Sequence, residues 1–533
     1  DETASRFFVY LPETEVYCGG GYKPHSNFDI VFAGQAIEGF GEGSVSRPPA
    51  SAGTGSDETV GLLANSDDCP GCPKRPRVAA KAVAIGVIDD GLAFAHERFC
   101  RRDKSTRLQG LWLQAYETAQ GPVDVNAGVL YQGARLDKLD ALRQEMRDVE
   151  LYRHPGVDQL NFSSPIHKPL AYRRAHGTHV MDLACGYDAV TEDRADRPIL
   201  AVQLPSDVTA DTSGQKLAPY FLQALRLIMQ WADDLEERLP LVINFSYGFA
   251  AGPKDGTHII EREIDALVRA RNQRGAPTIV VLPAGNNFES RTTALVSLKG
   301  GQTQELTWII PPDDETDNYL EIYVEAPGDI GAAAPAVDLK LTPPNGIPIL
   351  HAPRSDGKLQ VLCDGEWPVA GIYFDRMMAV DGMNRQRFFI AVNRTLDRRG
   401  KARPAASGRW RLAVAGKGEG TTRVRLFIQR DDTPSGYRRR GRQSYFDHPA
   451  AYQRDPAAGS YDQLCAANGE AIGPMTHSGT LSAIANGETP IVVGAAEGVD
   501  SSPPAAYTSS GPTETREGPD ISAVVDQSPA LKG

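Results

Sequence analysis

A chain of 533 residues is long enough for two to four compact units, and 41% of its residues are hydrophobic and 23% charged. This composition argues against a disordered, collagenous or membrane protein, and the longest apolar runs are far shorter than the roughly 20 residues that span a bilayer. The formal net charge of -12 argues against nucleic-acid binding as the main task, because counterion release needs a basic surface.

The first 78 residues are rich in Gly, Ser, Pro and Asp, which predicts an N-terminal extension that is partly linker. This segment has no basic-then-apolar leader, so localisation is not readable from a targeting signal.

Seven cysteines, an odd number, are scattered over the chain, unlike the dense spacing of a disulfide scaffold. They favour a cytoplasmic, reducing compartment, with secretion as the alternative. Cys69 and Cys72 have the spacing of a redox pair or of half a metal site, but no second pair follows, so we assign no metal site.

Between residues 79 and 300, apolar runs alternate with amphipathic stretches, as in an α/β fold. Nearly continuous runs of small and branched apolar residues are typical of strands buried on both faces of a parallel sheet. They predict strands at residues 82–88, 199–204, 241–245 and 278–282. Apolar residues three and four apart predict crossover helices at residues 218–237 and 258–271.

From residue 301 to residue 430 the pattern changes to short strands separated by turn-forming sequences. This spacing predicts an inserted β-sandwich, with strands at residues 319–324, 337–341 and 423–428. The α/β pattern resumes within residues 431–533, with an apolar run at residues 490–495. The insertion is therefore expected to interrupt one α/β domain.

A carboxylate ends the first predicted strand. Asp89 follows the apolar run Ile85–Ile88, where a buried charge is costly without a cationic or N–H partner. Aspartates at the ends of parallel strands serve many enzymes as metal or phosphate ligands, so this position alone does not decide a catalytic role.

Two histidines, His176 and His179, open an apolar segment that indicates a helix. Gly177 beside the first histidine lets another backbone approach closely. Histidines at this spacing can bind a metal, but the glutamate of the HExxH arrangement is missing. A histidine that caps or packs is the simpler interpretation of this motif alone.

The strand at residues 278–282 leads into Ala284, Gly285 and Asn286. An amide donor at a strand end can bond the anionic oxygen that develops in acyl transfer. An asparagine in an ordinary turn is the alternative.

Together the three motifs resemble, in type, order and context, those of the subtilisin-like serine proteases (subtilases, peptidase S8 family). Val-Ile-Asp-Asp-Gly-Leu around Asp89 is similar to the family's Asp signature, His-Gly-Thr-His-Val from His176 to its His signature, and Ala-Gly-Asn ending at Asn286 to its oxyanion segment. The resemblance covers roughly residues 80–300 and 460–533. It implies a subtilisin-like three-layer α/β fold with a mostly parallel sheet.

The resemblance also implies a role for each motif. Asp89 would orient the imidazole of His176, which would act as general base and then general acid, and Asn286 would donate to the tetrahedral oxyanion. The partner implied is an extended polypeptide held by β-augmentation, with no nucleic acid and no membrane span. No cofactor is expected; calcium sites are frequent in the family, but no carboxylate loop here can be assigned. The expected substrate-binding residues are Ser246, Tyr247, Gly248, Ala284 and Gly285.

The nucleophile is missing from this pattern. The family's Gly-Thr-Ser-x-Ala-x-Pro motif does not occur in the chain, although residues 507–512 and 518–522 resemble segments that precede it. The nearest string, Gly-Thr-Leu-Ser ending at Ser482, has leucine at the serine position and precedes the strand at 490–495, so we interpret Ser482 as a decoy. We expect the catalytic serine downstream of residue 533.

Two functions remain open. In the first, the full-length protein is a subtilisin-type serine endopeptidase with an Asp-His-Ser triad, and this chain is a truncated or processed portion that is inactive alone. In the second, the protein is a catalytically inactive pseudoprotease or peptide-binding module. Retention of Asp89, His176 and Asn286 favours the first. The insertion loosely resembles the jelly-roll modules of some subtilases through Gly408, Trp410 and Leu412.

Overall fold

A computed structural model describes most of the chain from residue 81 to residue 524. The described residues are 81–114, 128–153, 170, 175–190, 194, 196–214, 216–325, 334–378, 384–398, 400, 403–434, 440–449, 452–454, 461–463, 473–498 and 503–524. The predicted N-terminal extension, residues 1–78, and the pair Cys69 and Cys72 lie outside them.

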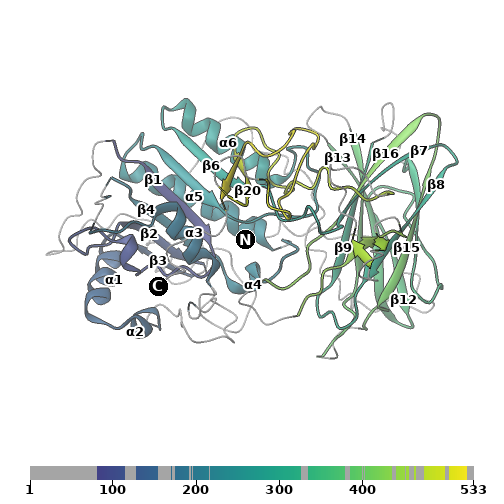
Figure 1. Cartoon of the computed structure of the whole chain (residues 1–533), viewed down its shortest axis with the longest axis horizontal. Helices are drawn as coiled ribbons and strands as arrows, with labels where there is room; N and C mark the ends of the chain where they lie inside the picture. The colour runs from purple at the N-terminus through teal and green to yellow at the C-terminus, as the bar shows by residue number, and fades with distance from the viewer. Residues whose placement is uncertain are drawn as a thin grey trace, which may run out of the picture.

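An eight-stranded sheet forms the centre of the α/β region (Figure 1). Its strand order is β3-β2-β4-β1-β5-β6-β20-β21, and every pairing is parallel except that of β2 with β3. The five strands predicted from apolar runs are confirmed as β1, β4, β5, β6 and β20. The strands are β1 (Ala84–Asp89), β2 (Leu108–Leu113), β3 (Val129–Gln132), β4 (Ile199–Gln203), β5 (Leu241–Phe245), β6 (Thr278–Pro283), β20 (Ile491–Ala496) and β21 (Ile521–Val524).

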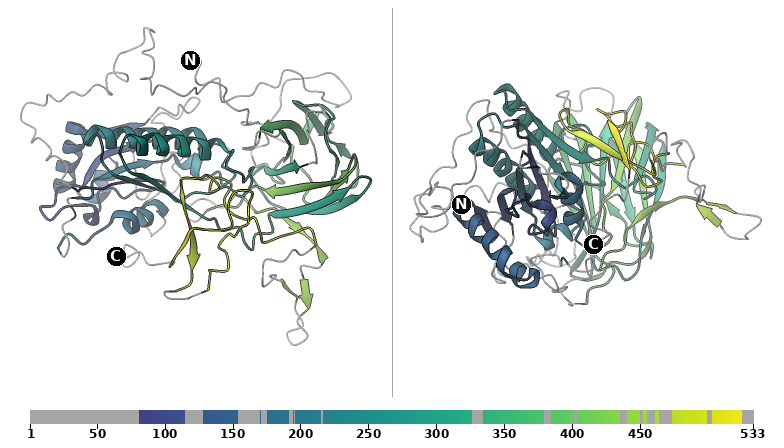
Figure 2. Two further views of the ribbon diagram at one scale, coloured as in Figure 1. Left: turned by 90° about the horizontal axis from the view of Figure 1, so that it is seen from above. Right: turned by 60° about the vertical axis from the view of Figure 1, so that its left-hand side comes forward.

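Helices lie on both sides of this sheet, as the view from above shows (Figure 2). Successive residues of β1 point to opposite faces, so Val87 packs in one apolar cluster with Met181, while Ile88 packs in another with Ile228 and Ile264. The two predicted crossover helices are confirmed as α5 and α6. The helices are α1 (Gly133–Glu145), α2 (Asp148–Arg153), α3 (His176–Cys185), α4 (Ser206–Thr209), α5 (Leu217–Leu235) and α6 (Ile259–Gln273), with a 3-10 helix η3 (Glu97–Phe99).

The inserted region consists of two antiparallel sheets packed face to face. One sheet has the order β11-β10-β15-β8-β17 and the other β12-β13-β14-β9-β16-β7. The strands are β7 (Thr293–Lys299), β8 (Thr303–Ile310), β9 (Asn318–Glu325), β10 (Val337–Thr342), β11 (Leu350–His351), β12 (Lys358–Asp364), β13 (Trp367–Met378), β14 (Asn384–Val392), β15 (Gly408–Gly416), β16 (Thr421–Ile428) and β17 (Tyr445–Asp447). A further hairpin joins β18 (Tyr452–Arg454) to β19 (Tyr461–Gln463).

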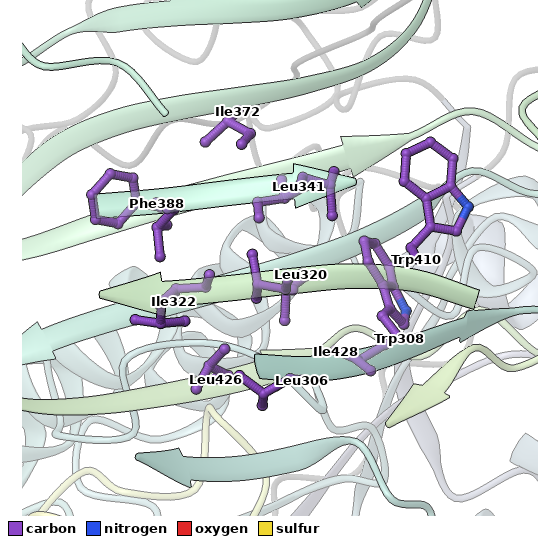
Figure 3. Close-up of a cluster of buried hydrophobic side chains, with 14 of the residues drawn as sticks. Leu306, Trp308, Leu320, Ile322, Leu341, Ile372, Phe388, Trp410, Leu426 and Ile428 are labelled. Carbon is purple, nitrogen blue, oxygen red and sulfur yellow. The ribbon is translucent and has the colours of Figure 1, made fainter. Parts of the chain in front are cut away.

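Alternate side chains of both sheets fill the space between them, and this apolar core is shown in Figure 3. Trp308 on β8 and Trp410 on β15 are fully buried there and lie opposite each other in the register of the two strands. The indole of Trp410 donates a hydrogen bond to the carbonyl oxygen of Ala406 at 2.9 Å. The strong core makes this region a compact unit with its own apolar interior.

The sandwich begins earlier and ends later than the predicted bounds of 301 and 430. Its first strand starts at Thr293 and pairs with β16, and its last ends at Asp447 and pairs with β8. The glycines at 300 and 301 are a tight turn between β7 and β8, with Gly301 at a φ of +80°. The predicted boundary at residue 301 therefore falls in the turn that carries the chain from one sheet of the sandwich to the other.

Among the described residues, none of the helices is long and apolar enough to cross a membrane. Cys100 and Cys185 are free and buried, whereas Cys363 is disulfide-bonded.

Candidate functional site

The sequence motifs converge at one edge of the parallel sheet. Asp89 is the last residue of β1, Ser246 follows β5, and Ala284 follows β6. Because β1, β5 and β6 are consecutive parallel neighbours, their carboxyl ends meet at the same edge. Crevices at this edge are where open α/β sheets commonly bind ligands.

Asp89 and His176 form a hydrogen-bonded pair. The Nδ1 atom of His176 lies 2.8 Å from Oδ1 of Asp89, which is fully buried, while half of the His176 side chain is exposed. His176 is the first residue of α3, and the N–H of Gly177 donates to the carbonyl oxygen of Asp90 at 2.8 Å. A Cβ atom at residue 177 would overlap that oxygen, so the close backbone approach expected from the sequence is confirmed.

Burial determines the electrostatics of the pair. Desolvation raises the pKa of Asp89 above its usual value, and the neighbouring His176 opposes this rise by attraction and by a hydrogen bond. The N–H of Asp90 also donates to Oδ1 at 2.8 Å, whereas Oδ2 is buried without a hydrogen-bond partner among the described residues. An ionised Asp89 can only accept a hydrogen bond, so with Asp89 ionised Nδ1 of a neutral imidazole carries the proton and Nε2 is the acceptor nitrogen.

Thr178 ties the start of α3 to the loop after β1, and the sequence analysis did not identify it. Its hydroxyl donates to the carbonyl oxygen of Gly91 at 2.6 Å and accepts from the N–H of Ala93 at 2.9 Å. The side chain of Gln203 on β4 accepts from the N–H of Leu92 at 2.8 Å. Thr178 could have been found from its place within the His motif, but Gln203 has no sequence signal.

One group of possible metal ligands occurs in the described part of the chain. Asp89, Asp90 and His176 each offer an atom within 4.8 Å of the others, and His179 is not a member of this group. A metal ion bound there would compete with the Asp89–His176 hydrogen bond. The geometry therefore suits a proton-transfer pair better than a metal centre.

The segment predicted to bind an oxyanion leaves β6 in a sharp turn. The N–H of Ala284 donates to the carbonyl oxygen of Val493 at 2.8 Å, which anchors the segment to β20. Gly285 has a φ of +108°, which few other residues adopt, and the following Asn286 is exposed. The turn thus presents the Asn286 amide to solvent beside the strand ends.

The predicted substrate-binding residues after β5 lie next to the histidine. The ring of Tyr247 meets the ring of His176 edge-on at a centroid distance of 6.2 Å and stacks on Phe245 at 5.6 Å. The Asn244 amide donates to the hydroxyl oxygen of Ser246 at 2.9 Å. Ser246, Tyr247 and Gly248 are each partly exposed, so their backbone borders the same edge as the Asp89–His176 pair.

Ser482, interpreted as a decoy, is fully buried. Its hydroxyl oxygen accepts a hydrogen bond from the N–H of Phe249 at 3.2 Å, and its own N–H donates to the carbonyl oxygen of Ala284 at 2.7 Å. These contacts place Ser482 between the segments after β5 and β6, in a structural position.

No protein-family model matches the chain, and no curated protein matches it. Among solved structures, the fold is similar to that of the CspB protease of Clostridium perfringens, with a TM-score of 0.54 and 17% sequence identity. The match covers 83% of this chain and 75% of that one. At this identity the likeness shows a shared mixed α/β and β-rich fold.

Proposed function

We propose that the full-length protein is a serine endopeptidase of the subtilisin type, which hydrolyses peptide bonds with a serine encoded after residue 533. The observation that carries this proposal is the fully buried Asp89 bound through Oδ1 to Nδ1 of a half-exposed His176 at 2.8 Å. A buried carboxylate that orients an accessible imidazole is the orienter and base of a Ser-His-Asp triad.

The residues at the sheet edge would divide the reaction between them. Nε2 of His176 would take the proton of the serine hydroxyl as that oxygen attacks the peptide carbonyl, and would return it to the leaving amine. Asp89 would stabilise the imidazolium that forms between the two steps. The amide of Asn286 would donate to the oxyanion, a contribution of about 10²- to 10³-fold in kcat where such donors have been removed.

Apolar side chains on the face of the parallel sheet that α3 covers support the presence of a helix after β21, and this helix would carry the serine. Residues in register on neighbouring parallel strands point to the same face of the sheet. Val242 is in register with Ile279, and Val493 is in register with Ile521. The same face carries Val87, which α3 covers. On the strands farther from α3, Ile279 of β6 is 40% exposed and Ile521 of β21 is 57% exposed. A helix packed on this face would start close to His176 and bury these side chains.

Fold similarity to the CspB protease also supports the proposal, but only by analogy, because one fold can host unrelated activities. The extended polypeptide substrate is proposed on the same basis, together with the backbone of Ser246–Gly248 at the site. We propose no cofactor.

The first test is the reading frame beyond residue 533, where a Gly-Thr-Ser motif is expected within a few tens of codons. The second test treats the full-length protein with a fluorophosphonate probe, which labels activated serines. Labelling that is lost in His176→Ala and in the Ser→Ala variant of the motif supports the proposal. A folded full-length protein that resists the probe would instead be a peptide-binding pseudoprotease.

The 533-residue chain is the matched control. It is expected neither to cleave casein nor to take the probe, because it lacks the nucleophile. Activity of either kind that disappears in Ser482→Ala would overturn the assignment of Ser482 to a structural position.

A further inference from the structure

A segment between β20 and β21, residues 507–510, lies against the turn that follows β6. The N–H of Ser509 donates a hydrogen bond to the carbonyl oxygen of Gly285 at 2.9 Å. The hydroxyl oxygen of Ser509 accepts a hydrogen bond from the N–H of Asn287, also at 2.9 Å. Ser509 is 1% exposed and lies 222 residues after Asn287 in the chain, so these bonds join two distant segments inside the protein.

The two hydrogen bonds hold the peptide groups on both sides of Asn286. The carbonyl of Gly285 belongs to the peptide group before Asn286, and the N–H of Asn287 belongs to the peptide group after it. Each peptide group is planar, so only the two backbone torsion angles of Asn286 lie between them. Because Ser509 bonds both groups, it fixes these angles and with them the direction in which the Asn286 side chain leaves the backbone. Asn286 is exposed, so packing around its side chain contributes little to this direction.

Gly285 allows Ser509 to come this close to the turn. A Cβ atom at residue 285 would lie 2.9 Å from the hydroxyl oxygen of Ser509 and 3.2 Å from Nδ2 of Asn287, and Cβ contacts under 3.0 Å are essentially never seen. The φ of +108° at Gly285 also favours glycine. The glycine that begins the turn is therefore needed both for its backbone conformation and for contact with the serine.

Hydrogen bonds to two other parts of the α/β region hold Ser509 in place. The hydroxyl oxygen of Thr508 accepts from the N–H of Ala495 on β20 at 2.9 Å. On the other side, the N–H of Ser510 donates to the hydroxyl oxygen of Thr480 at 3.0 Å. Because both of its neighbours are anchored, Ser509 gives the turn a fixed support, as precise catalytic geometry requires.

We propose that Ser509 is a positioning residue for the oxyanion donor: it directs the amide of Asn286 toward the carbonyl oxygen that becomes negative during acyl transfer. This role rests on the proposed function, in which Asn286 stabilises the oxyanion. Since Ser509 is buried, it acts through Asn286 and not on the substrate. An oxyanion donor is effective only within hydrogen-bond distance of the developing charge, so a small shift of the turn is costly.

The first test measures peptide hydrolysis by the full-length protein and its variants, per folded molecule. Asn286→Ala removes the donor, and kcat should fall by about 10²- to 10³-fold. Ser509→Ala keeps the donor but frees the turn, and kcat should fall by about 10- to 100-fold. KM should change by less than about 2-fold in both variants, because the lost interaction forms only in the transition state.

The double variant Asn286→Ala, Ser509→Ala separates positioning from a general structural role. If Ser509 acts through Asn286, its loss has no further effect once the amide is gone, and kcat should stay within about 3-fold of that of Asn286→Ala. A structural role would lower kcat by the same factor whether or not the amide is present. Losses that multiply in the double variant, or an unchanged kcat in Ser509→Ala, overturn the inference.

A matched control is Ser444→Ala, which removes the hydroxyl of a fully buried serine of the sandwich, bonded to Asp431. It should leave kcat per folded molecule unchanged. A fall in kcat as large as that of Ser509→Ala would mean that any lost buried hydroxyl loosens the site, and the inference would be wrong.

Hydrogen exchange separates the inference from the proposed function, because it requires no catalysis. In the 533-residue chain the Asn287 amide should exchange at least about 10-fold faster in Ser509→Ala than in the unchanged chain. If Ser509→Ala does not fold, the unchanged chain decides: an Asn287 amide that exchanges as fast as in an unstructured peptide overturns the role of Ser509, even in an active protease. Slow exchange in a full-length protein without peptidase activity overturns the proposed function, with Ser509 still fixing the turn.

Discussion

The parallel sheet and the sandwich differ in the partners that surround a buried aspartate. In the sandwich, Arg387 and Asp375 are both buried and joined by two hydrogen bonds, of 2.9 and 2.6 Å, in a bidentate pair. At the edge of the parallel sheet, Asp89 is equally buried, but within the described part of the chain its only side-chain partner is the half-exposed imidazole of His176. One carboxylate is fully compensated inside the protein, and the other is not.

This difference separates a structural charge from a functional one. Burial alone would lower the pKa of Arg387, but attraction and a hydrogen bond to Asp375 raise it above its usual value, so the carboxylate stabilises the guanidinium cation. Burial raises the pKa of Asp89 because desolvation outweighs the attraction of His176. Groups whose pKa is shifted by burial, as for Asp89, cluster at active sites, where the shifted pKa serves catalysis and lowers stability. The same substitution should therefore act in opposite ways at the two positions.

The largest effect is expected for Asp89→Asn in the full-length protein. Loss of the carboxylate removes the acceptor that orients His176, and kcat should fall by about 10⁴-fold, as in related triads. The folded pKa of Asp89 is raised, so the ionised form opposes folding as the pH rises above the unfolded pKa. Urea unfolding at neutral pH should therefore show no loss of stability, and a marked loss would mean that Asp89 is structural.

The matched change in the sandwich is Asp375→Asn. It leaves the buried guanidinium of Arg387 without its anion, and breaking such a pair costs about 3 kcal/mol of unfolding free energy. Calorimetry should show a lower melting temperature for the sandwich. Peptidase activity per folded molecule should stay unchanged; a parallel loss of kcat would connect the sandwich directly to the chemistry.

Sequence periodicity predicted the strands of the parallel sheet well because they are buried on both faces and read as continuous apolar runs. The order of the parallel strands explains why Asp89, at the end of β1, and the segment after β6 lie at one edge. His176 begins α3, and the sequence grouped it with them only through the family resemblance. Strand β2 and the bounds of the sandwich were missed. The turn at Gly301 has the same composition as a linker, and only the pairing of β7 with β16 distinguishes them.

Contacts between distant segments could not be predicted from the sequence. The position of Ser482 depends on backbone groups of Phe249 and Ala284, which lie about 200 residues away along the chain. Short polar strings such as Gly-Thr-Leu-Ser carry no information about which backbone groups will surround them. The motif order could exclude Ser482 as a nucleophile but could not show what it does.

Lys254 provides an intermediate case at the junction of the two regions. Its amino group is buried, donates to the carbonyl oxygen of Gly479 at 3.0 Å and lies 4.3 Å from the ring centre of Phe427. Burial, together with Arg425, lowers the pKa of Lys254 to about 7. No carboxylate contacts the amino group among the described residues, so the cation is only partly compensated.

The pH dependence of stability tests this interpretation. Because the folded pKa is below the unfolded value near 10.5, the unfolded chain binds more protons between about pH 7 and pH 10.5. Lys254 should therefore add stability with rising pH, at most about 1.4 kcal/mol per pH unit. Lys254→Met removes this dependence, so its stability relative to the unchanged protein should be highest near pH 6 and fall toward pH 9. A constant difference would mean that Lys254 is protonated throughout.

The smallest effect is expected where both charges of a pair face water. Arg403 and Asp364 are joined at 2.7 Å in the sandwich, but each side chain is 56% exposed. Water compensates either charge almost as well as its partner does, so Arg403→Ala should change the unfolding free energy by less than about 1 kcal/mol, and less still in high salt. If urea unfolding showed that Arg403→Ala lowers the unfolding free energy as much as Asp375→Asn does, an ion pair would contribute to stability whether or not it is buried. The contrast between Asp89 and Asp375 would then no longer follow from how completely each buried charge is compensated.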